Sequence, residues 1–523
     1  MSDYNNSLQP ADRLPTEVLA YIFSFLPDIY PPMILYNRSL PPLGWVCILH
    51  VCHLWREVAR GSGKLWTRIE TALGPTWAAE FVLLSGNQSI ILDKATRSSG
   101  RRIRETILRV LENASQRLSV LRAGDTRSEH WRVSDIRWLI AALLEHSKSL
   151  GNLSTLSLKS PEPPGMPFPH QILVSVRHVF ITSVMAGSNT DWASFPRAFQ
   201  SIHLLNDEHY IPSGLQGLFG VVGRCDQLHT LEIQSSFMNT MSIDGQISLP
   251  ALRSLIVSGE SRAIATFLQA VEDLSSVVEF RSLGLGSSPL EMLAFVSTMN
   301  RIGATSRPYN SLCVYQGWRS HEVLVVGCYP MTDQPYAIQR GESTFHVTLR
   351  HDVDDAFEPT LALATTVLAQ MDLSSVQNLV LKSICAPPEM WHKWFGRAVA
   401  VERLVLQGEY TLTMLRALAL GDSQEPLRAP EDALLPGLQE IVTWGASMRL
   451  EVLAPSMEPI YGVGLLKDAL VTRASLGCAP RRLHLTHCSA DLHALAELVE
   501  AVPEDMREWS MESLTRELSR SGE

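Results

Sequence analysis

The chain has 523 residues, of which 46% are hydrophobic and 19% charged. This composition excludes a disordered polypeptide and predicts several folded units or one elongated repeat array. Acidic residues outnumber basic ones by 54 to 44, and the net charge of −10 argues against a nucleic-acid partner. No stretch approaches the roughly 20 uninterrupted apolar residues that span a bilayer, and the first ten residues lack a signal-peptide pattern. We therefore expect no membrane association and a cytoplasmic or nuclear location.

The first predicted element is a short helix from Leu14 to Leu26, which follows a disordered tail over residues 1–10. Pro15 suits the first helical position, and Glu17 suits the positive end of the helix dipole. Apolar residues at positions 18, 19, 22, 23, 25 and 26 cover more of this helix than the single stripe that a surface helix needs. Part of the helix should therefore pack on something outside its own small domain.

A proline-rich loop follows, and apolar residues then recur at helical spacing from Trp45 to about Arg60, which predicts a second helix. A third short apolar element contains Leu65, Trp66 and Ile69. The resulting unit, residues 11–72, is marginal in size for an independent domain. A partner that covers its apolar face would stabilise it.

These segments resemble the F-box family in order and spacing. The matching patterns are Leu14-Pro15-x-Glu17-Val18-x-x-x-Ile22-Phe23-Ser24-x-Leu26, then Val51-Cys52-x-x-Trp55-Arg56-x-Val58-Ala59, then Leu65-Trp66. The proline-rich insert before Leu43-Gly44-Trp45 and the run Leu49-His50-Val51-Cys52 are similar to the large F-box families of mushroom-forming fungi. The loop from Pro27 to Leu43 is longer than in the common animal form of the family.

The resemblance implies a three-helix F-box domain that docks on the Skp-type adaptor of a cullin-RING ubiquitin ligase. By that likeness, eight residues match family positions that form either the adaptor contact or the core of the domain, and the sequence does not divide them between these roles. They are Leu14, Pro15, Ile22, Phe23, Leu26, Val51, Cys52 and Trp55. The alternative is that these apolar residues form an ordinary small helical domain.

Beyond Thr71 the chain repeats a short apolar strand, a turn and a helix-like stretch. The predicted strands cover residues 90–92, 119–121, 156–158, 179–181, 202–204, 231–233, 255–257, 278–280, 347–349, 379–381, 404–406, 440–442 and 483–485. From 156 to 278 their starts are 23, 23, 29, 24 and 23 residues apart, within the roughly 20 to 29 residues of a leucine-rich repeat. Several strands follow an earlier hydrophobic residue, as in Leu228-His229-Thr230-Leu231, which gives the L-x-x-L-x-L core of such a repeat.

Helices are predicted between many of these strands, at residues 102–115, 134–146, 263–274, 360–371, 390–399 and 465–475. A repeated strand and helix predicts an α/β leucine-rich-repeat-like solenoid over residues 73–500, a horseshoe whose parallel strands line the concave face. The fold class is therefore α+β, with the helical F-box domain preceding the solenoid.

Three segments depart from the repeat. Residues 284–342 are an irregular insert, in which Leu312–Tyr315 and Val323–Gly327 predict an added hairpin or an outsized unit. Residues 422–436 are polar and contain proline, which predicts an inserted loop. The C-terminal tail, residues 501–523, predicts a capping helix with a frayed end, because terminal repeats need a polar outer face.

No motif in the sequence predicts a catalytic residue, a metal site or a cofactor. Gly61-Ser62-Gly63-Lys64 lacks the first glycine and the final Ser or Thr of a phosphate loop, so we interpret it as a turn. The Cys and His residues at 47, 50, 52 and 53 do not share a helix face, and those at 478, 484, 487 and 488 straddle one strand. The run His351–Asp355 lacks the glycine and distal glutamate of a calcium loop. The eight cysteines lack the spacing of a secreted disulfide framework, and we expect them to be reduced.

The sequence favours a non-enzymatic substrate-recognition subunit of a Skp-cullin-F-box ubiquitin ligase, in which the solenoid holds an unidentified protein substrate near the transfer machinery. The candidates for substrate contact are polar residues on the strands, namely Ser157, His203, Glu232, Lys382 and His484. The alternative is a non-degradative adaptor or repeat scaffold that binds protein partners without ligase function. A hydrolase built on the solenoid would need a titratable constellation, which the sequence does not reveal.

Overall fold

The structure is a computed structural model that divides into two compact units, Met1–Leu252 and Arg253–Glu523. In the first unit it describes residues 14–32, 43–93, 100–123, 133–159, 170–182, 195–205, 216–234 and 246–252. In the second it describes residues 253–286 except 273 and 275, 311–315, 322–329, 345–351, 361–445 with gaps at 362–363, 366, 370, 385 and 421–428, then 450–451, 460–486, 488, 492–501 and 508–512. The predicted tail over residues 1–10 lies outside the described residues.

The N-terminal region consists of short helices. These are α2 (Thr16–Ser24), α3 (Leu26–Ile29), the 3-10 helix η2 (Gly44–His50), α4 (His53–Gly61) and the 3-10 helix η3 (Gly63–Trp66). The prediction of one continuous second helix is wrong, because the backbone is extended at Cys52 (φ −153°, ψ 174°) and separates η2 from α4. Pro27 lies in the first turn of α3, where the missing N–H of proline leaves no helical hydrogen bond unmade.

The sheet of the first unit begins inside the predicted F-box domain. Strand β1 (Arg68–Glu70) pairs in parallel with β2 (Ile90–Asp93). The following strands pair in parallel and in chain order: β3 (Leu118–Ala123), β4 (Thr155–Lys159), β5 (His178–Thr182), β6 (Ser201–Leu205) and β7 (Thr230–Gln234). The third apolar element of the sequence is thus a 3-10 turn followed by the first strand of the solenoid sheet.

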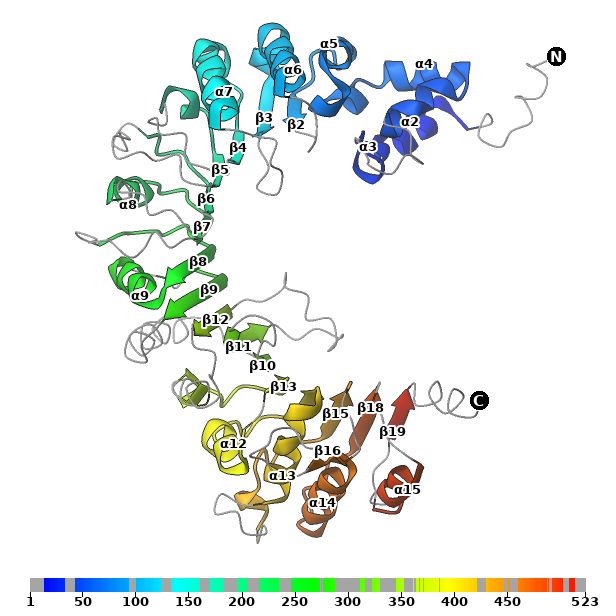
Figure 1. The fold of residues 1–523 in the computed structure, drawn as a ribbon, viewed down its shortest axis with the longest axis vertical. Coiled ribbons are helices and arrows are strands. Elements are labelled where there is room, and N and C mark those ends of the chain that lie inside the picture. The colour runs from blue at the N-terminus through cyan, green and yellow to red at the C-terminus, as the bar shows by residue number, and fades with distance from the viewer. Residues whose placement is uncertain are drawn as a thin grey trace, which may run out of the picture. The chain divides into compact units, whose positions relative to one another are not determined.

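Helices of the first unit lie along one face of its sheet (Figure 1). They are α5 (Pro75–Leu84), α6 (Gly100–Ala114), α7 (Val133–Glu145) and α8 (Gln216–Val222), with the 3-10 helices η4 (Thr71–Leu73), η5 (Ser115–Arg117), η6 (Ser147–Ser149) and η7 (His170–Leu173). Helices α6 and α7 were predicted, whereas α5 and α8 were not. Because side chains alternate along a strand, Leu156 and Leu158 point into the core under the helices. The residues between such positions lie on the other side, which we call the open face.

The second unit contains two groups of parallel strands. Strands β8 (Ser254–Glu260) and β9 (Glu279–Gly286) form one, and β13 (Asn378–Lys382), β14 (Arg403–Gln407), β15 (Glu440–Trp444), β18 (Arg482–Thr486) and β19 (Glu508–Glu512) form the other. A meander joins them: β12 (Phe345–His351) pairs with β9, β10 (Ser311–Tyr315) pairs with β13, and β11 (Glu322–Tyr329) runs antiparallel between β10 and β12. The predicted hairpin in the irregular insert is confirmed. Its reversed strand order keeps both outer strands parallel to their neighbours.

The helices of the second unit are α9 (Ser261–Ala270), α12 (Pro388–Phe395), η10 (Glu409–Leu412), α13 (Thr413–Ala419), η11 (Pro430–Asp432), α14 (Gly462–Ser475) and α15 (Leu492–Ala501), and β16 (Leu450–Glu451) pairs with β17 (Ile460–Tyr461). The predicted C-terminal capping helix is wrong where the tail is described, because β19 is a strand whose Trp509 and Met511 pair with Leu483 and Leu485. The last residues of the loop predicted at 422–436 belong to the hydrophobic core, since Leu434 and Leu435 are buried. Every predicted strand of the solenoid is confirmed.

Candidate functional site

Helices α2 and α3 expose apolar side chains. Their exposed apolar residues, between 40% and 75% accessible, are Val18, Tyr21, Ile22, Phe25 and Ile29. On the other side of α2, Leu19 and Phe23 are buried. Val51, which follows η2, is 57% exposed. Exposed apolar residues in this number mark a protein-interaction site, and we call these six residues the apolar face.

The structure places the eight residues singled out by the F-box resemblance in three environments. Pro15, Ile22 and Val51 are exposed, Leu14, Leu26, Cys52 and Trp55 are half-buried, and Phe23 is buried. The Phe23 ring centroid lies 5.1 Å from that of Trp55, so Phe23 belongs to the core of the domain and not to its surface. The Cys52 sulfur accepts a hydrogen bond from the Trp55 backbone N–H at 3.4 Å and caps α4. The sequence did not single out Tyr21 or Ile29, whose exposure depends on the turn from α2 into α3.

The core of the N-terminal helices continues into the solenoid. Trp45, Trp66 and Phe81 are almost fully buried, and their ring centroids lie 5.0 to 5.7 Å apart. The Trp66 indole N–H donates to the Ala59 carbonyl at 2.7 Å, which satisfies its one polar atom in the core. Because Phe81 belongs to α5, residues 11–72 share their core with the first solenoid helix.

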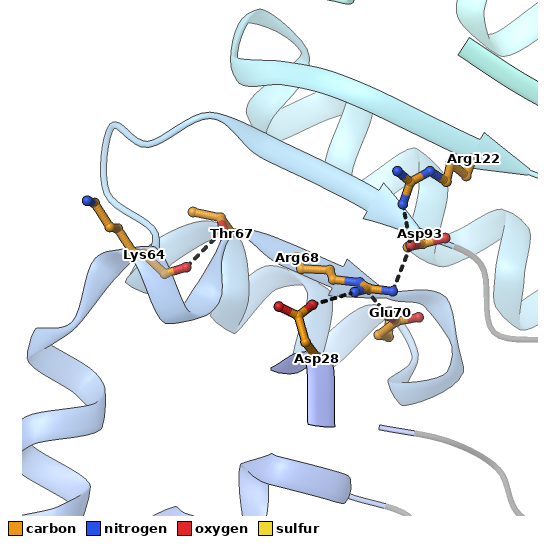
Figure 2. Close-up of polar contacts among 7 residues, drawn as sticks. All are labelled: Asp28, Lys64, Thr67, Arg68, Glu70, Asp93 and Arg122. Atoms are coloured by element: carbon orange, nitrogen blue, oxygen red, sulfur yellow. Dashed lines mark hydrogen bonds and ion pairs between the residues drawn. The ribbon is translucent and has the colours of Figure 1, made fainter. Parts of the chain in front are cut away.

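An ion cluster joins helix α3 to the first strands of the solenoid (Figure 2). The Arg68 guanidinium lies 3.2 Å from Asp28 Oδ1 on α3, 3.0 Å from Glu70 Oε1 and 3.0 Å from Asp93 Oδ2 on β2. Arg122 on β3 lies 3.0 Å from the same Asp93 oxygen. Guanidinium groups hold several carboxylates in a fixed geometry, so this cluster ties α3 to three adjacent strands.

Glu70 is the most buried carboxylate of the cluster, with 7% of the residue exposed. Burial, and next the charge of Asp93, raise the pKa of Glu70 to about 7, although Arg68 and Arg122 act in the opposite direction. Glu70 therefore gains or loses its charge near neutral pH. At higher pH, three carboxylates face two guanidinium groups.

The open face of the first unit carries a row of central strand positions. The register places Arg122, Ser157, Phe180, His203 and Glu232 side by side on β3 to β7. Ser157 is buried, and the side chains of His203 and Glu232 are 14% and 16% exposed. The substrate-contact candidates predicted in this unit therefore lie in one row, but they are less accessible than expected, and His203 packs on Phe180 and Glu232.

His203 contacts three neighbours on the open face. Its ring stacks on Phe180 with centroids 4.0 Å apart and planes 12° from parallel. Its Nδ1 lies 2.5 Å from Glu232 Oε2, and its Nε2 lies 2.6 Å from Ser201 Oγ. The spacing Ser-x-His on one strand could have indicated the second contact, but only the register brings Glu232 to His203.

The open face of the second unit is apolar at its centre. Cys313, Val380, Val405 and Val442 occupy successive strands and are at most 8% exposed. Burial raises the pKa of the Cys313 thiol to about 12, so this thiol stays protonated. The predicted contact residues lie around this stripe: Lys382 is half-buried at the end of β13, and His484 Nε2 lies 3.6 Å from Glu440 Oε1.

In the part of the chain that the structure describes, no three His, Cys, Asp or Glu side chains are placed to hold a metal ion. Gly63 and Lys64 begin η3, as expected for a turn. His487 and residues 352–355, which belong to two of the sequence clusters, lie outside the described ranges. No helix in those ranges is both long enough and apolar enough to cross a membrane.

Residues 11–71 match the F-box-like family model. No curated protein is detectably similar to the chain. Among solved structures, the chain is similar to a leucine-rich-repeat protein of Leptospira interrogans at 13% identity and a TM-score of 0.32, over 82% of this chain and 91% of the other. At this TM-score the likeness carries no argument about the fold, which the strand order and register define. The protein thus combines an N-terminal F-box-like domain with a parallel-sheet solenoid.

Proposed function

We propose that this protein is a substrate-recognition subunit of a Skp-cullin-F-box ubiquitin ligase. The observation that carries the proposal is the apolar face, which lies within the residues that match the F-box-like family. It includes Ile22 and Val51, two of the positions that the resemblance relates to the adaptor contact or to the core of the domain. Docking on a Skp-type adaptor would bury these side chains and bring the protein to a cullin-RING ligase in the cytoplasm or nucleus. The proline-rich insert favours the F-box type found in mushroom-forming fungi.

Co-expression with a Skp-type adaptor, followed by size-exclusion chromatography, tests the adaptor contact. Val51→Asp should abolish the shared peak, because a carboxylate would lose its hydration inside an apolar interface. Val278→Asp is the matched control, since Val51 and Val278 are both 57% exposed and Val278 lies in the other unit. Circular dichroism should show equal folding of both variants. A wild-type chain that gives no shared peak at micromolar concentration, or a Val51→Asp chain that still gives one, would refute the proposal.

We infer that the solenoid holds the protein substrate, and the row from Arg122 to Glu232, which is polar except for Phe180, supports the open face of the first unit as the contact surface. A second measurement separates a ligase subunit from a non-degradative adaptor. The purified adaptor complex is mixed with the cullin and its RING partner, and co-elution is recorded. A ligase subunit enters that assembly, whereas a scaffold that binds only the adaptor does not.

A further inference from the structure

Ser201, His203 and Glu232 form a hydrogen-bonded chain on the open face of the first unit. Ser201 and His203 lie on β6, two residues apart and therefore on the same face, and the register sets Glu232 of β7 beside His203. The Ser201 Oγ to His203 Nε2 distance is 2.6 Å, and the His203 Nδ1 to Glu232 Oε2 distance is 2.5 Å. The imidazole thus bridges a hydroxyl and a carboxylate through its two different nitrogens.

The chemistry of the three groups fixes which atom donates and which accepts in each of these hydrogen bonds. A carboxylate only accepts hydrogen bonds, so the proton of a neutral His203 ring lies on Nδ1, which donates to Glu232. Nε2 then carries the lone pair and accepts the Ser201 O–H. Phe180 stacks on one side of the ring and restricts its rotation. A hydroxyl held against a base that a third group orients is the arrangement of an activated serine nucleophile.

We propose that Ser201 is a reactive nucleophile, with His203 as its general base and Glu232 as the residue that positions His203, and that it takes acyl groups from activated esters. The Ser201 oxygen attacks the ester carbonyl carbon while its proton moves to His203 Nε2. The bond to the alcohol oxygen breaks, and the alcohol leaves with the proton from Nε2. Water then hydrolyses the acyl-serine by the same steps in reverse. This activity goes beyond the proposed adaptor function and does not depend on it.

The backbone around Ser201 limits the rate of this reaction. The Ser201 N–H donates to the Arg177 carbonyl at 3.0 Å, so it is engaged and does not stabilise an oxyanion. Loss of one oxyanion-hole donor typically slows acyl transfer by about 10²- to 10³-fold. The Ser201 residue is also only 7% exposed, which favours small reagents. Single covalent labelling is therefore a more direct readout than multiple turnover.

The test treats the full chain with a small fluorophosphonate, in which serine displaces fluoride from phosphorus, and maps the adduct by mass spectrometry. Ser201 should be labelled, and His203→Gln should slow labelling by at least about 100-fold. Ser254 is the matched control serine: it also begins a strand, but its Oγ donates directly to Glu279 Oε2 at 2.8 Å. It should remain unlabelled.

Glu232→Gln keeps the test decisive if His203→Gln fails to fold. It leaves the size of the side chain unchanged and should slow labelling of Ser201 by about tenfold or more, because the imidazole loses the carboxylate that orients it. Thermal unfolding establishes that each variant is folded. Absence of an adduct at Ser201 in the wild type, or equal labelling rates in the wild type and a folded variant, would overturn the proposal. The hydrogen bonds among Ser201, His203 and Glu232 would then have a structural role only.

Discussion

The Arg68 guanidinium lies 3.2 Å from the Asp28 carboxylate and so links helix α3 of the F-box-like domain to the first strand of the solenoid. The Asp28 side chain is 81% exposed, whereas those of Glu70 and Asp93 are 8% and 14% exposed. The exposed pair of Arg68 with Asp28 should therefore contribute less to the stability of the fold than the contacts of Arg68 with Glu70 and Asp93.

Asp28→Asn should lower the free energy of unfolding by less than about 1 kcal/mol, because exposed ion pairs contribute little. Arg68→Met should lower it by about 2 to 4 kcal/mol, because Glu70 and Asp93 then lose a shared cation in a partly buried site. Urea unfolding at pH 7.5 measures both values. Equal losses of unfolding free energy in the two variants would show that the exposed pair of Arg68 with Asp28 accounts for the stabilisation by the whole cluster.

The charge on Glu70 makes stability depend on pH. Its pKa is about 7 in the folded chain against an ordinary value of 4.5, so the folded state favours the protonated form. The stability that protonated Glu70 gives the folded state is fully present below pH 4.5 and is lost as the pH rises through about 7. Glu70→Gln removes the ionisation. The variant should gain stability relative to wild type between pH 5 and 8, by on the order of 3 kcal/mol at most. A difference that stays constant over this range would contradict the assignment.

Much of the solenoid follows from local sequence. The L-x-L cores predicted strands such as β4 and β14. Two leucines that are two residues apart lie on the same face of a strand, so one buried face of the sheet covers both. Strand β1 was not predicted, since Arg68-Ile69-Glu70 has one apolar residue between two charges that the ion cluster compensates. Strand β19 was predicted as helix, because Trp509 and Met511 alternate over too few residues to distinguish the two periods.

The candidate sites depended more on three-dimensional arrangement. The sequence indicated an apolar excess on the first helix, but only the packing of Phe23 against Trp55 shows which residues remain exposed. His203 and Glu232 were each candidates on separate strands. Their contact depends on the β6–β7 register, in which 29 residues separate paired positions. Single-sequence periodicity contains no information on that pairing.

The shared aromatic core makes the F-box-like domain depend on the solenoid. Phe81→Ala should lower the free energy of unfolding by about 3 to 5 kcal/mol, since it opens a cavity against Trp45 and Trp66. Hydrogen exchange in α4 should accelerate in this variant, although Phe81 lies outside residues 11–72. Leu83→Ala is the control on the same helix, because Leu83 is 72% exposed. Unchanged exchange in α4 would mean that the domain has a closed core of its own.

Arg473 holds a turn of the second unit from inside the core. The residue is fully buried, and its guanidinium donates to the carbonyls of Leu434 at 2.8 Å, Leu435 at 2.9 Å and Cys478 at 3.2 Å. Leu435 has a φ of +55°, a left-handed conformation that costs a non-glycine residue about 1 kcal/mol or more. The Arg473 hydrogen bonds therefore stabilise a backbone that the local sequence disfavours.

Arg473→Met should lower the free energy of unfolding by about 3 kcal/mol, because buried carbonyls lose their donors. Arg473→Lys should restore little of this, since one ammonium group cannot reproduce the planar fork that reaches three carbonyls. Arg481→Met, at an exposed position, is the matched control and should change stability by less than about 0.5 kcal/mol. Urea unfolding of the full chain gives all three values. Recovery of wild-type stability in Arg473→Lys would show that charge alone, and not the fork geometry, secures the turn.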